Sequence, residues 1–332
     1  MSLSQPRLQA ALQAVSDACV ITRQVQAGSQ DIAQMSKDDR SPVTVADFAA
    51  QALIARRLQQ ALGPVVMVGE EDSAALRAAE PSLRNAVIDT LRPQWEDIRE
   101  GDVFEAIDAG GHDASADAYW TLDPIDGTKG FLRGGQYAVS LAYIEHGQVT
   151  IGVLGCPNLS ADLHRPFDDP DPHGLICYAA AGQGSWSLPA DHSPAQPVAL
   201  HASTAIPDSV RLCESVESGH AKHDFNARLV AYLGGHSAPA RLDSQAKYAV
   251  VARGQADAYV RIPSREGYVE KIWDHAPGLL LATEAGAIVS DSRGAALDFS
   301  AGRELRRNHG IVCAAAPLHP RIIAAIRELG KD

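Results

Sequence analysis

Two aspartates stand three positions apart in the stretch WTLDPIDGTKGF, at residues 120–131. Carboxylates held close together repel each other, so a pair such as Asp123 and Asp126 usually needs cations. Hard oxygen ligands of this kind are those that Mg²⁺ and Mn²⁺ prefer. Gly127 and Thr128 would then bring backbone N–H groups and a hydroxyl close to an anion, as at helix N-termini that hold phosphate. The stretch therefore favours a site for cations and a phosphate, although a type I turn explains the same letters.

Familiar sites for cations or phosphates do not match this spacing. An EF-hand loop needs acids at every second position and a glutamate at its twelfth, which here is Gly134. A phosphatase with an aspartate nucleophile would place its aspartates two positions apart rather than three. The G-x-x-x-x-G-K motif of a P-loop is missing as well. No residue has the features of a covalent nucleophile, so we expect direct hydrolysis of any phosphate ester.

Three more acidic segments fit the same chemistry. SPVTVADFAAQ places Asp47 at the start of a helix, and VGEEDS places Glu70 and Glu71 at the end of an apolar strand. Open α/β sheets usually bind ligands at such strand ends. IWDHAPGLLLATEAG places Asp274 immediately before another helix, which Gly286 is expected to end.

Each of these acids also has a purely structural alternative. Thr44 and Asp47 resemble a capping box, so Asp47 could simply stabilise the helix N-terminus. Asp274 could be a plain N-cap, and Glu70 could be a solvated loop acid. Four acidic segments in one chain nevertheless favour a shared cation site over coincidence.

Together these motifs resemble the inositol monophosphatase superfamily of Mg²⁺-dependent, lithium-inhibited phosphomonoesterases. The segments that carry the resemblance are VTVADFAAQ, VGEEDS, LDPIDGTKGF and IWDHAPG…EAG. Longer stretches are similar to its 3′(2′),5′-bisphosphate nucleotidase branch, namely FLRGGQYAVSLAYIEHG…GCPNL, ESVESGHAKHD, LDSQAKYAVVARG and YVRI…EKIWDHA. The resemblance covers about residues 40–315 and is weak across 76–118 and the loops around 164–173 and 189–200.

The resemblance implies a set of metal ligands. Glu70, Asp123 and the carbonyl oxygen of Ile125 would hold one Mg²⁺, and Asp123, Asp126 and Asp274 would hold a second. Glu70 would contribute to a third, looser ion, and Mn²⁺ could replace Mg²⁺. Cations of this kind neutralise phosphoryl oxygens, lower the pKa of bound water and stabilise the leaving alkoxide in an in-line displacement.

The resemblance also implies the reaction. Asp47 and Thr128 would together activate a metal-bound water, because a hydroxyl bonded to a carboxylate can orient it. The water would remove the 3′-phosphate of adenosine 3′,5′-bisphosphate, and 3′-phosphoadenosine 5′-phosphosulfate would be a second candidate substrate from sulfur metabolism. An inositol mono- or polyphosphate phosphatase remains an alternative, as does a non-catalytic nucleotide-binding module.

The nucleotide end of the site is assigned by the same resemblance. Ser244 and Lys247 lie three apart, on one face of an expected helix whose N-cap would be Asp243. With His223 and Arg261 they would contact the nucleotide and its 5′-phosphate, and a basic pair would separate this substrate from an inositol monophosphate. Alternatively, Lys247 is a solvated helix residue, Arg261 pairs with a nearby acid and His223 belongs to a surface loop.

One residue departs from the pattern. The family usually has W-D-x-A-A-G, whereas this chain has Pro277 in WDHAPG. Proline fits the first turn of a helix, where the N–H has no intrahelical partner. We therefore expect Pro277 to be harmless, or at most to shift Asp274 slightly.

Hydrophobic patterns predict the elements that position these residues. Residues 5–35 should form one or two helices and residues 51–62 an amphipathic helix. Residues 64–73 should contain a buried strand, YWTLDPIDG a second, and residues 136–157 a β-hairpin that turns at His146 and Gly147. HRPFDDPDPHG, at residues 164–174, is expected to be a surface loop or domain junction.

Strands and helices alternate beyond this loop, which suggests a second α/β unit. With the resemblance, the pattern predicts a layered αβαβα sandwich. Residues 1–165 would form an α+β domain with most metal ligands, and residues 166–332 an α/β domain that contributes Asp274 and the nucleotide pocket. The active site would lie between them.

Composition limits the classes of function that remain. The chain has 332 residues, 45% of them hydrophobic, which suffices for a large core or two packed domains. A formal net charge of −12 argues against a nucleic-acid polymer as partner, because phosphate backbones demand a basic face. No apolar run approaches the roughly 20 residues of a membrane span, and the N-terminus lacks the pattern of a secretory signal. Five scattered cysteines indicate a reducing cytoplasm, so we expect a cytoplasmic protein. We also expect a monomer or a weak homodimer.

Overall fold

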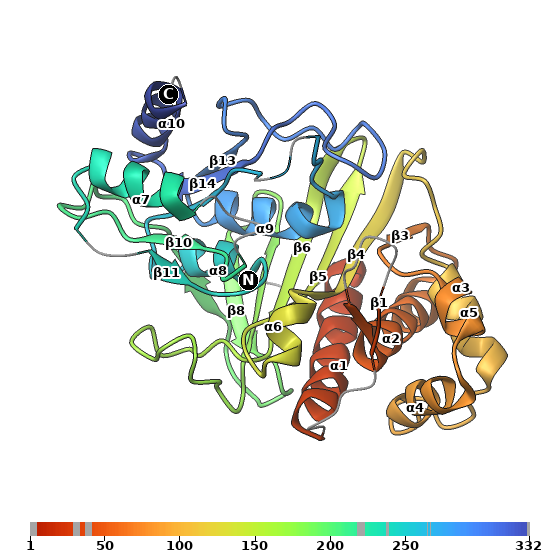
Figure 1. Ribbon diagram of the computed structural model, residues 1–332. Coiled ribbons are helices and arrows are strands. Elements are labelled where there is room, and N and C mark those ends of the chain that lie inside the picture. Colours follow the sequence, from red (N-terminus) through yellow and green to blue (C-terminus); the bar gives the residue numbers. More distant parts are fainter. Residues whose placement is uncertain are drawn as a thin grey trace.

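Five alternating layers of helices and strands build the molecule, as Figure 1 shows for the computed structural model. The layers are helices, a large sheet, helices, a smaller sheet and helices, and this confirms the predicted αβαβα sandwich. The structure describes residues 5–28, 34–36, 42–217, 223–236, 239–263, 265 and 267–330.

The helices are amphipathic or fully buried, according to the layer in which they lie. The outer layer next to the large sheet contains α1 (Pro6–Gly28) and α2 (Val45–Leu62), followed by α3 (Ser73–Ala78), α4 (Pro81–Leu91) and α5 (Glu100–Asp108). A short helix, α6 (Thr128–Leu132), follows the acidic stretch. The middle layer contains α8 (Ala246–Ala252) and α9 (Ile272–Glu284), and the far layer α7 (His223–Tyr232) and α10 (His319–Leu329).

The larger sheet has seven strands in chain order, from β3 to β9. They are β3 (Met67–Gly69), β4 (Ala118–Asp126), β5 (Ala138–Glu145), β6 (Gln148–Cys156), β7 (Leu175–Ala180), β8 (Ser185–Pro189) and β9 (Val198–Leu200). β3 pairs with β4 in parallel, and every later pair is antiparallel. A parallel first pair places the end of β3 beside the end of β4, where the acids lie.

The smaller sheet has the order β11-β10-β12-β14-β13. Its strands are β10 (Leu212–Glu214), β11 (Ala240–Arg241), β12 (Ala258–Arg261), β13 (Ala287–Ser290) and β14 (Ile311–Ala315). β10 is parallel to β11 and β12, whereas β14 is antiparallel to β12 and β13. A separate hairpin of β1 (Gln34–Ser36) and β2 (Pro42–Thr44) precedes α2.

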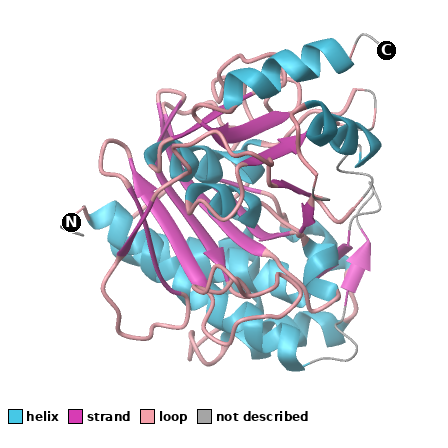
Figure 2. Ribbon diagram, turned by 90° about the vertical axis from the view of Figure 1, so that its left-hand side faces the viewer, coloured by secondary structure: helices cyan, strands magenta, loops and turns pink. Residues whose placement is uncertain are grey.

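Successive residues of each strand enter different layers of the core. One face of the large sheet, with residues such as Leu141 and Val153, packs on α1 and α2. The other face, with Ala142 and Leu154, packs on α8 and α9 together with the inner face of the small sheet. Figure 2 shows the strands lying between these helical layers. Because successive strand residues point to opposite faces, alternate apolar residues of both sheets pack against the middle helices α8 and α9.

Most predicted elements are confirmed. α1 lies in the expected helical range, the segment 51–62 belongs to the longer α2, and β5 and β6 form the expected hairpin with both turn residues at positive φ. The buried strand expected within 64–73 is β3, which ends at Gly69 and is followed by a short acidic loop before α3 begins at Ser73. In the described part of the chain, no helix has the length and apolar character needed to cross a membrane.

The two sheets bear on the expected division of the chain. Strands β7 to β9 lie beyond residue 165, yet they continue the sheet that contains β3 to β6. The smaller sheet begins at Leu212. We therefore propose that the boundary between an N-terminal and a C-terminal unit lies after residue 200 rather than at 165.

Candidate active site

The end of β4 leaves the regular sheet at the predicted acids. The register between β4 and β5 shifts between Asp123 and Asp126, where Pro124 cannot donate a backbone hydrogen bond. The Asp123 carboxylate accepts a bond of 3.0 Å from the backbone N–H of Ile125. The Thr128 hydroxyl donates to the Ile125 carbonyl oxygen at 3.2 Å. These local bonds shape the loop that presents both carboxylates.

A cleft of about 360 Å³ opens at this loop. It is lined by residues from the loop after β3, from β4, α6, β12 and α9, and from the start of α8 with the segment before it. Ten of the predicted site residues line it: Glu70, Asp123, Ile125, Asp126, Gly127, Thr128, Ser244, Lys247, Arg261 and Asp274. The fold therefore brings together segments that are far apart in the sequence.

The acids of the cleft are close enough to share a cation. One carboxylate oxygen from each of Asp123, Asp126 and Asp274 lies within 4.8 Å of the others. Burial raises the pKa of Asp123 well above its usual range, and Glu70, Asp126 and Asp274 raise it further. Burial raises the pKa of Asp126 to about 6 although Lys247 opposes this. Carboxylates that repel each other in this way, with a backbone carbonyl beside them and no thiolate, fit a hard divalent cation such as Mg²⁺ or Mn²⁺.

Asp274 reaches the cleft from the first turn of α9. The cap position of this helix is Lys271, so the alternative role of Asp274 as N-cap is wrong. Burial and the nearby Asp126 raise the pKa of the Asp274 carboxyl well above its usual range. Gly286, at φ 94°, follows the C-cap as predicted.

Glu70 follows β3 and its backbone is held on the neighbouring strand. Its N–H donates to the carbonyl oxygen of Leu122 at 3.0 Å. Gln51, buried in α2, donates to the carbonyl of Glu71 at 2.6 Å and accepts from the N–H of Glu71 at 3.1 Å. A Cβ at Gly69 would lie 2.6 Å from the Gln51 amide oxygen, so a side chain there would force this amide to move. α2 therefore positions the loop that carries Glu70.

Asp47 lies in the first turn of α2, in the capping box that the sequence offers as its structural alternative. Its carboxylate accepts bonds of 2.8 Å from the Thr44 N–H and 2.6 Å from the Thr44 hydroxyl. The side chain is 2% exposed. The capping role is confirmed, and a catalytic role for Asp47 stays a prediction.

Lys247 is buried in α8 at 2% exposure, so its expected alternative as a solvated helix residue is wrong. Its ammonium donates to the Leu242 carbonyl at 3.1 Å and also bonds the Ser244 carbonyl. Burial lowers its pKa to about 8, although the negative charge of Asp126 opposes this shift.

Ser244 does not share a helical face with Lys247, as the spacing suggested. α8 begins only at Ala246, and Ser244 has a φ of 66° in the preceding loop. Asp243 is not the N-cap, because that position is Gln245, and the Asp243 carboxylate instead accepts two bonds of 2.9 Å from Arg133. A left-handed residue cannot continue a helix, so the three-residue spacing is misleading here.

Arg261 pairs with an acid, as its structural alternative proposed, and still lines the cleft. Its Nε donates to Glu270 at 2.8 Å and its Nη2 to the Tyr268 hydroxyl at 3.0 Å. The nearby Glu270 raises the pKa of Arg261 despite its burial. The backbone of His223 begins α7, but its side chain lies outside the described residues.

Pro277 lies inside α9 rather than in its first turn, so the expected position is wrong. A proline here cannot donate to the carbonyl of Trp273, one helical turn earlier. The Ser140 hydroxyl of β5 donates to that carbonyl at 2.6 Å instead. Gly152 of β6 lets the Pro277 backbone pack closely against the sheet. Two strand residues therefore compensate for the proline beside Asp274.

Sequence reasoning missed Arg303, which joins both sides of the cleft. Its guanidinium donates to the carbonyls of Gly69 at 2.7 Å and His112 at 2.9 Å. It also lies over the Trp273 ring, 4.9 Å from the centroid. No local motif marks this arginine, because its partners come from distant segments. Glu270 and His275, by contrast, both stand in the EKIWDHA segment, but the five-residue spacing between them does not predict that they pair.

Comparisons with known proteins agree with this geometry. The model of the inositol monophosphatase family matches residues 4–331. A 3′(2′),5′-bisphosphate nucleotidase of Schizosaccharomyces pombe is 41% identical, with 88% of this chain and 85% of that protein covered. A protein of the same name from Oryza sativa is 39% identical, with 98% and 94% covered. The solved structure of the extragenic suppressor protein suhB from Bartonella henselae has a TM-score of 0.63 at 18% identity, with 98% and 99% covered, and so shares the fold.

Proposed function

Since the chain belongs to the inositol monophosphatase family, we propose that it hydrolyses the 3′-phosphate of adenosine 3′,5′-bisphosphate to give AMP and phosphate. The observation that carries this proposal is the composition of one cleft. Acids gather at one end of it, around Asp123, while Lys247 and Arg261 lie in the same cleft. Relatives at 39–41% identity carry the corresponding name.

Glu70, Asp123, Asp126, Asp274 and the carbonyl of Ile125 would hold two or three Mg²⁺ ions, which Mn²⁺ could replace. When bound, these ions neutralise phosphoryl oxygens and lower the pKa of water. Burial, and then the neighbouring carboxylates, raise the pKa of Asp123 and Asp274, and this supports the assignment because a bound cation would offset both effects. Competition of Li⁺ for this acidic site would inhibit the enzyme.

Thr128 and Asp47 are the groups we assign to the attacking water. The Thr128 hydroxyl lines the cleft next to the Ile125 carbonyl, where it can orient a water for in-line attack on phosphorus. Asp47 would take up the proton. The water would attack phosphorus directly, forming the new P–O bond as the bond to the 3′-oxygen of the ribose breaks, so no covalent intermediate with the protein would form.

Ser244, Lys247, Arg261 and His223 would bind the nucleotide and its 5′-phosphate. Two cations at this end offer charge-assisted bonds that an inositol monophosphate could not use fully. Gly127 packs so closely against Ser244 that a side chain at position 127 would collide with Ser244. The glycine thereby keeps the loop after Asp126 in contact with the nucleotide end of the cleft.

Phosphate release from adenosine 3′,5′-bisphosphate and from inositol 1-phosphate tests the proposal, with Mg²⁺ and then with EDTA. We expect fast, Mg²⁺-dependent turnover of the nucleotide and little of the inositol ester. Preference for the inositol ester would agree with the assigned cation ligands but would refute the assignment of Lys247 and Arg261 to the 5′-phosphate. Tight binding of the nucleotide without phosphate release would instead support a non-catalytic binding module.

A further inference from the structure

A chain of buried polar groups runs behind the nucleotide end of the cleft. The Tyr248 hydroxyl lies 3.0 Å from Nδ1 of His275, and Nε2 of His275 lies 3.0 Å from one carboxylate oxygen of Glu270. The other oxygen of Glu270 accepts the 2.8 Å bond from Arg261. Tyr248, His275 and Glu270 are each less than 5% exposed. Four residues from α8, β12, α9 and the loop before α9 thus form one continuous network.

The charged pair at one end sets the direction of hydrogen bonding along this chain. Glu270 accepts from the Arg261 guanidinium and is a carboxylate, so Nε2 of His275 donates to its other oxygen. With its proton on Nε2, the ring accepts at Nδ1 from the Tyr248 hydroxyl. Burial opposes ionisation of Glu270, but Arg261 and His275 outweigh it and lower its pKa to about 2.

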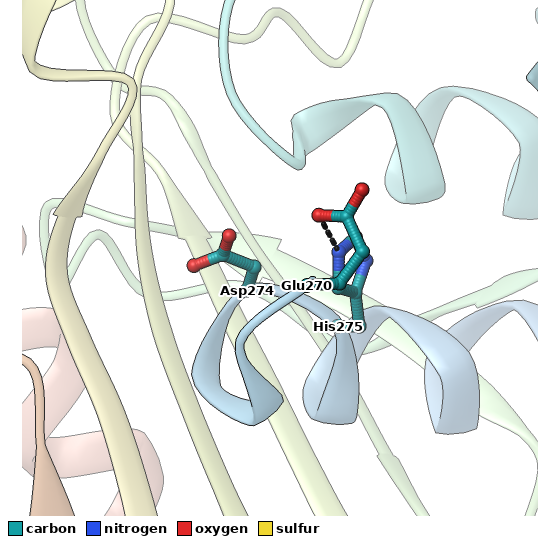
Figure 3. Close-up of side chains that lie close together, drawn as sticks. All are labelled: Glu270, Asp274 and His275. Atoms are coloured by element: carbon teal, nitrogen blue, oxygen red, sulfur yellow. Dashed lines mark hydrogen bonds and ion pairs between the residues drawn. The ribbon is translucent and has the colours of Figure 1, made fainter. Parts of the chain in front are cut away.

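Glu270 and His275 together with Asp274 are also close enough to suggest a metal site. Their hydrogen bonds favour another role, since both oxygens of Glu270 already have partners. Figure 3 shows the Glu270 carboxylate facing the His275 ring, whereas the Asp274 carboxylate points to the other side. The two functions are therefore separated on α9: Asp274 faces the acidic end of the cleft, and His275 supports the network.

We infer that Tyr248, His275 and Glu270 are positioning residues that hold the Arg261 guanidinium in the cleft for the substrate's second phosphate. An arginine fixed in advance loses little conformational freedom when it binds an anion. The network would thereby contribute to the preference for a bisphosphate over a monoester that lacks the 5′-phosphate. This inference rests on the proposed function, and it assigns specificity to residues that do not touch the substrate.

The test compares Tyr248→Phe and Glu270→Gln with the wild type on adenosine 3′,5′-bisphosphate and adenosine 3′-phosphate. The informative quantity is the ratio of kcat/KM for the two substrates. Removal of one hydrogen bond in Tyr248→Phe should lower this ratio about fivefold, through KM rather than kcat. Glu270→Gln removes a charged partner of Arg261 and should lower the ratio at least about tenfold. If both substrates lose activity by the same factor, the network is merely structural and the inference is refuted.

Tyr119→Phe is a matched control, because Tyr119 is also buried and its hydroxyl also makes one bond, to the Phe299 carbonyl at 3.3 Å. It should leave the ratio unchanged. Calorimetric binding of AMP and of adenosine gives a second readout that does not require turnover. The preference for AMP should weaken in Tyr248→Phe, and an unchanged preference would refute the inference. A wild type that hydrolyses neither substrate would refute the proposed function. The comparison of AMP and adenosine binding would still test whether the network positions Arg261.

Discussion

Lys247 carries its charge at a position where a protein interior rarely accepts one. The ammonium is buried against the Tyr259 ring, 5.2 Å from its centroid, and is held by backbone carbonyls. Burial lowers its pKa to about 8, while Asp126 acts in the opposite direction. A lysine with this pKa changes its charge near the working range of many enzymes, and only its charged form attracts a phosphate.

The pH dependence of substrate preference should therefore follow the ionisation of Lys247. The group is protonated below pH 8 and neutral above it, so affinity for the 5′-phosphate should fall as pH rises through about 8. We expect kcat/KM for adenosine 3′,5′-bisphosphate, relative to adenosine 3′-phosphate, to decline above that pH. This ratio reports ionisation of the free enzyme. In Lys247→Met the ratio should be low and should not change near pH 8. A decline that persists in this variant would show that another group is responsible.

The fit between α9 and the large sheet decides where Asp274 lies. Proline inside a helix costs about 3 kcal/mol relative to alanine, partly through the lost hydrogen bond. In this chain the Ser140 hydroxyl satisfies the Trp273 carbonyl that Pro277 cannot bond. Ser140 pairs directly with Asp123 across β4 and β5. One serine on β5 thus connects β4 and α9, the strand and the helix that supply carboxylates to the cleft.

A double-mutant cycle on Ser140 and Pro277 tests this compensation. Ser140→Ala alone leaves a buried carbonyl unbonded and should reduce the free energy of unfolding by about 1–3 kcal/mol. In the Pro277→Ala background the new N–H can bond the same carbonyl, so Ser140→Ala should cost about 1 kcal/mol less. Urea unfolding in the presence of EDTA measures the free energy of unfolding of the wild type, both single variants and the double variant without a contribution from bound ions. Strictly additive effects would show that the serine does not compensate for the proline.

Elements with a regular hydrophobic period could be predicted from the sequence, and so could the acids at their ends. β4 and the β5–β6 hairpin follow alternation, and Asp123 and Asp126 stand where the strand is broken by Pro124. The start of α8 could not be predicted, because the left-handed φ of Ser244 is not encoded by its letter. Contacts such as that of Arg303 with Gly69 join residues 234 positions apart, and a single sequence gives no signal for them.

The cation site is assembled from both ends of the chain, and Arg303 holds these parts together. Its bond to the Gly69 carbonyl fixes the residue before Glu70, and its stacking on Trp273 fixes the residue before Asp274. The Arg303 carbonyl also accepts from the N–H of Ile272 at 3.2 Å. The arginine thereby links the loop after β3 to the start of α9.

Arg303→Met should therefore weaken binding of Mg²⁺ itself. Loss of groups that orient metal ligands typically costs about 10–100-fold in affinity, and we expect about tenfold here. Calorimetric titration of the metal-free protein with Mg²⁺ measures this directly. Unlike Tyr248→Phe, this variant should reduce kcat/KM for bisphosphate and monophosphate substrates alike at limiting Mg²⁺. Unchanged Mg²⁺ affinity in a folded variant would exclude the proposed link.

Stability of the whole molecule should depend on divalent cations, and this dependence should vary with pH. Burial raises the pKa of Asp126 to about 6, and those of Asp123 and Asp274 are raised as well. Because the folded form binds these protons more tightly than the unfolded chain, stability without cations should fall as pH rises from about 4 through 6. Above that range the carboxylates are charged and repel each other, which is the state that a cation stabilises. At pH 5, protons compete with the cation for the same oxygens.

Melting temperatures in EDTA and in excess Mg²⁺ at pH 5 and pH 7.5 test this coupling. A cation at 100 times its Kd stabilises the folded state by about 2.7 kcal/mol, which corresponds to a rise of about 4 °C for a chain of this size. We expect that rise at pH 7.5 and a much smaller one at pH 5. In Asp126→Asn one repelling charge is lost, so the protein in EDTA should melt at a higher temperature and gain less from Mg²⁺. An equal gain at both pH values would show that Mg²⁺ stabilises the protein elsewhere, because only binding to raised-pKa carboxylates competes with protons in this range.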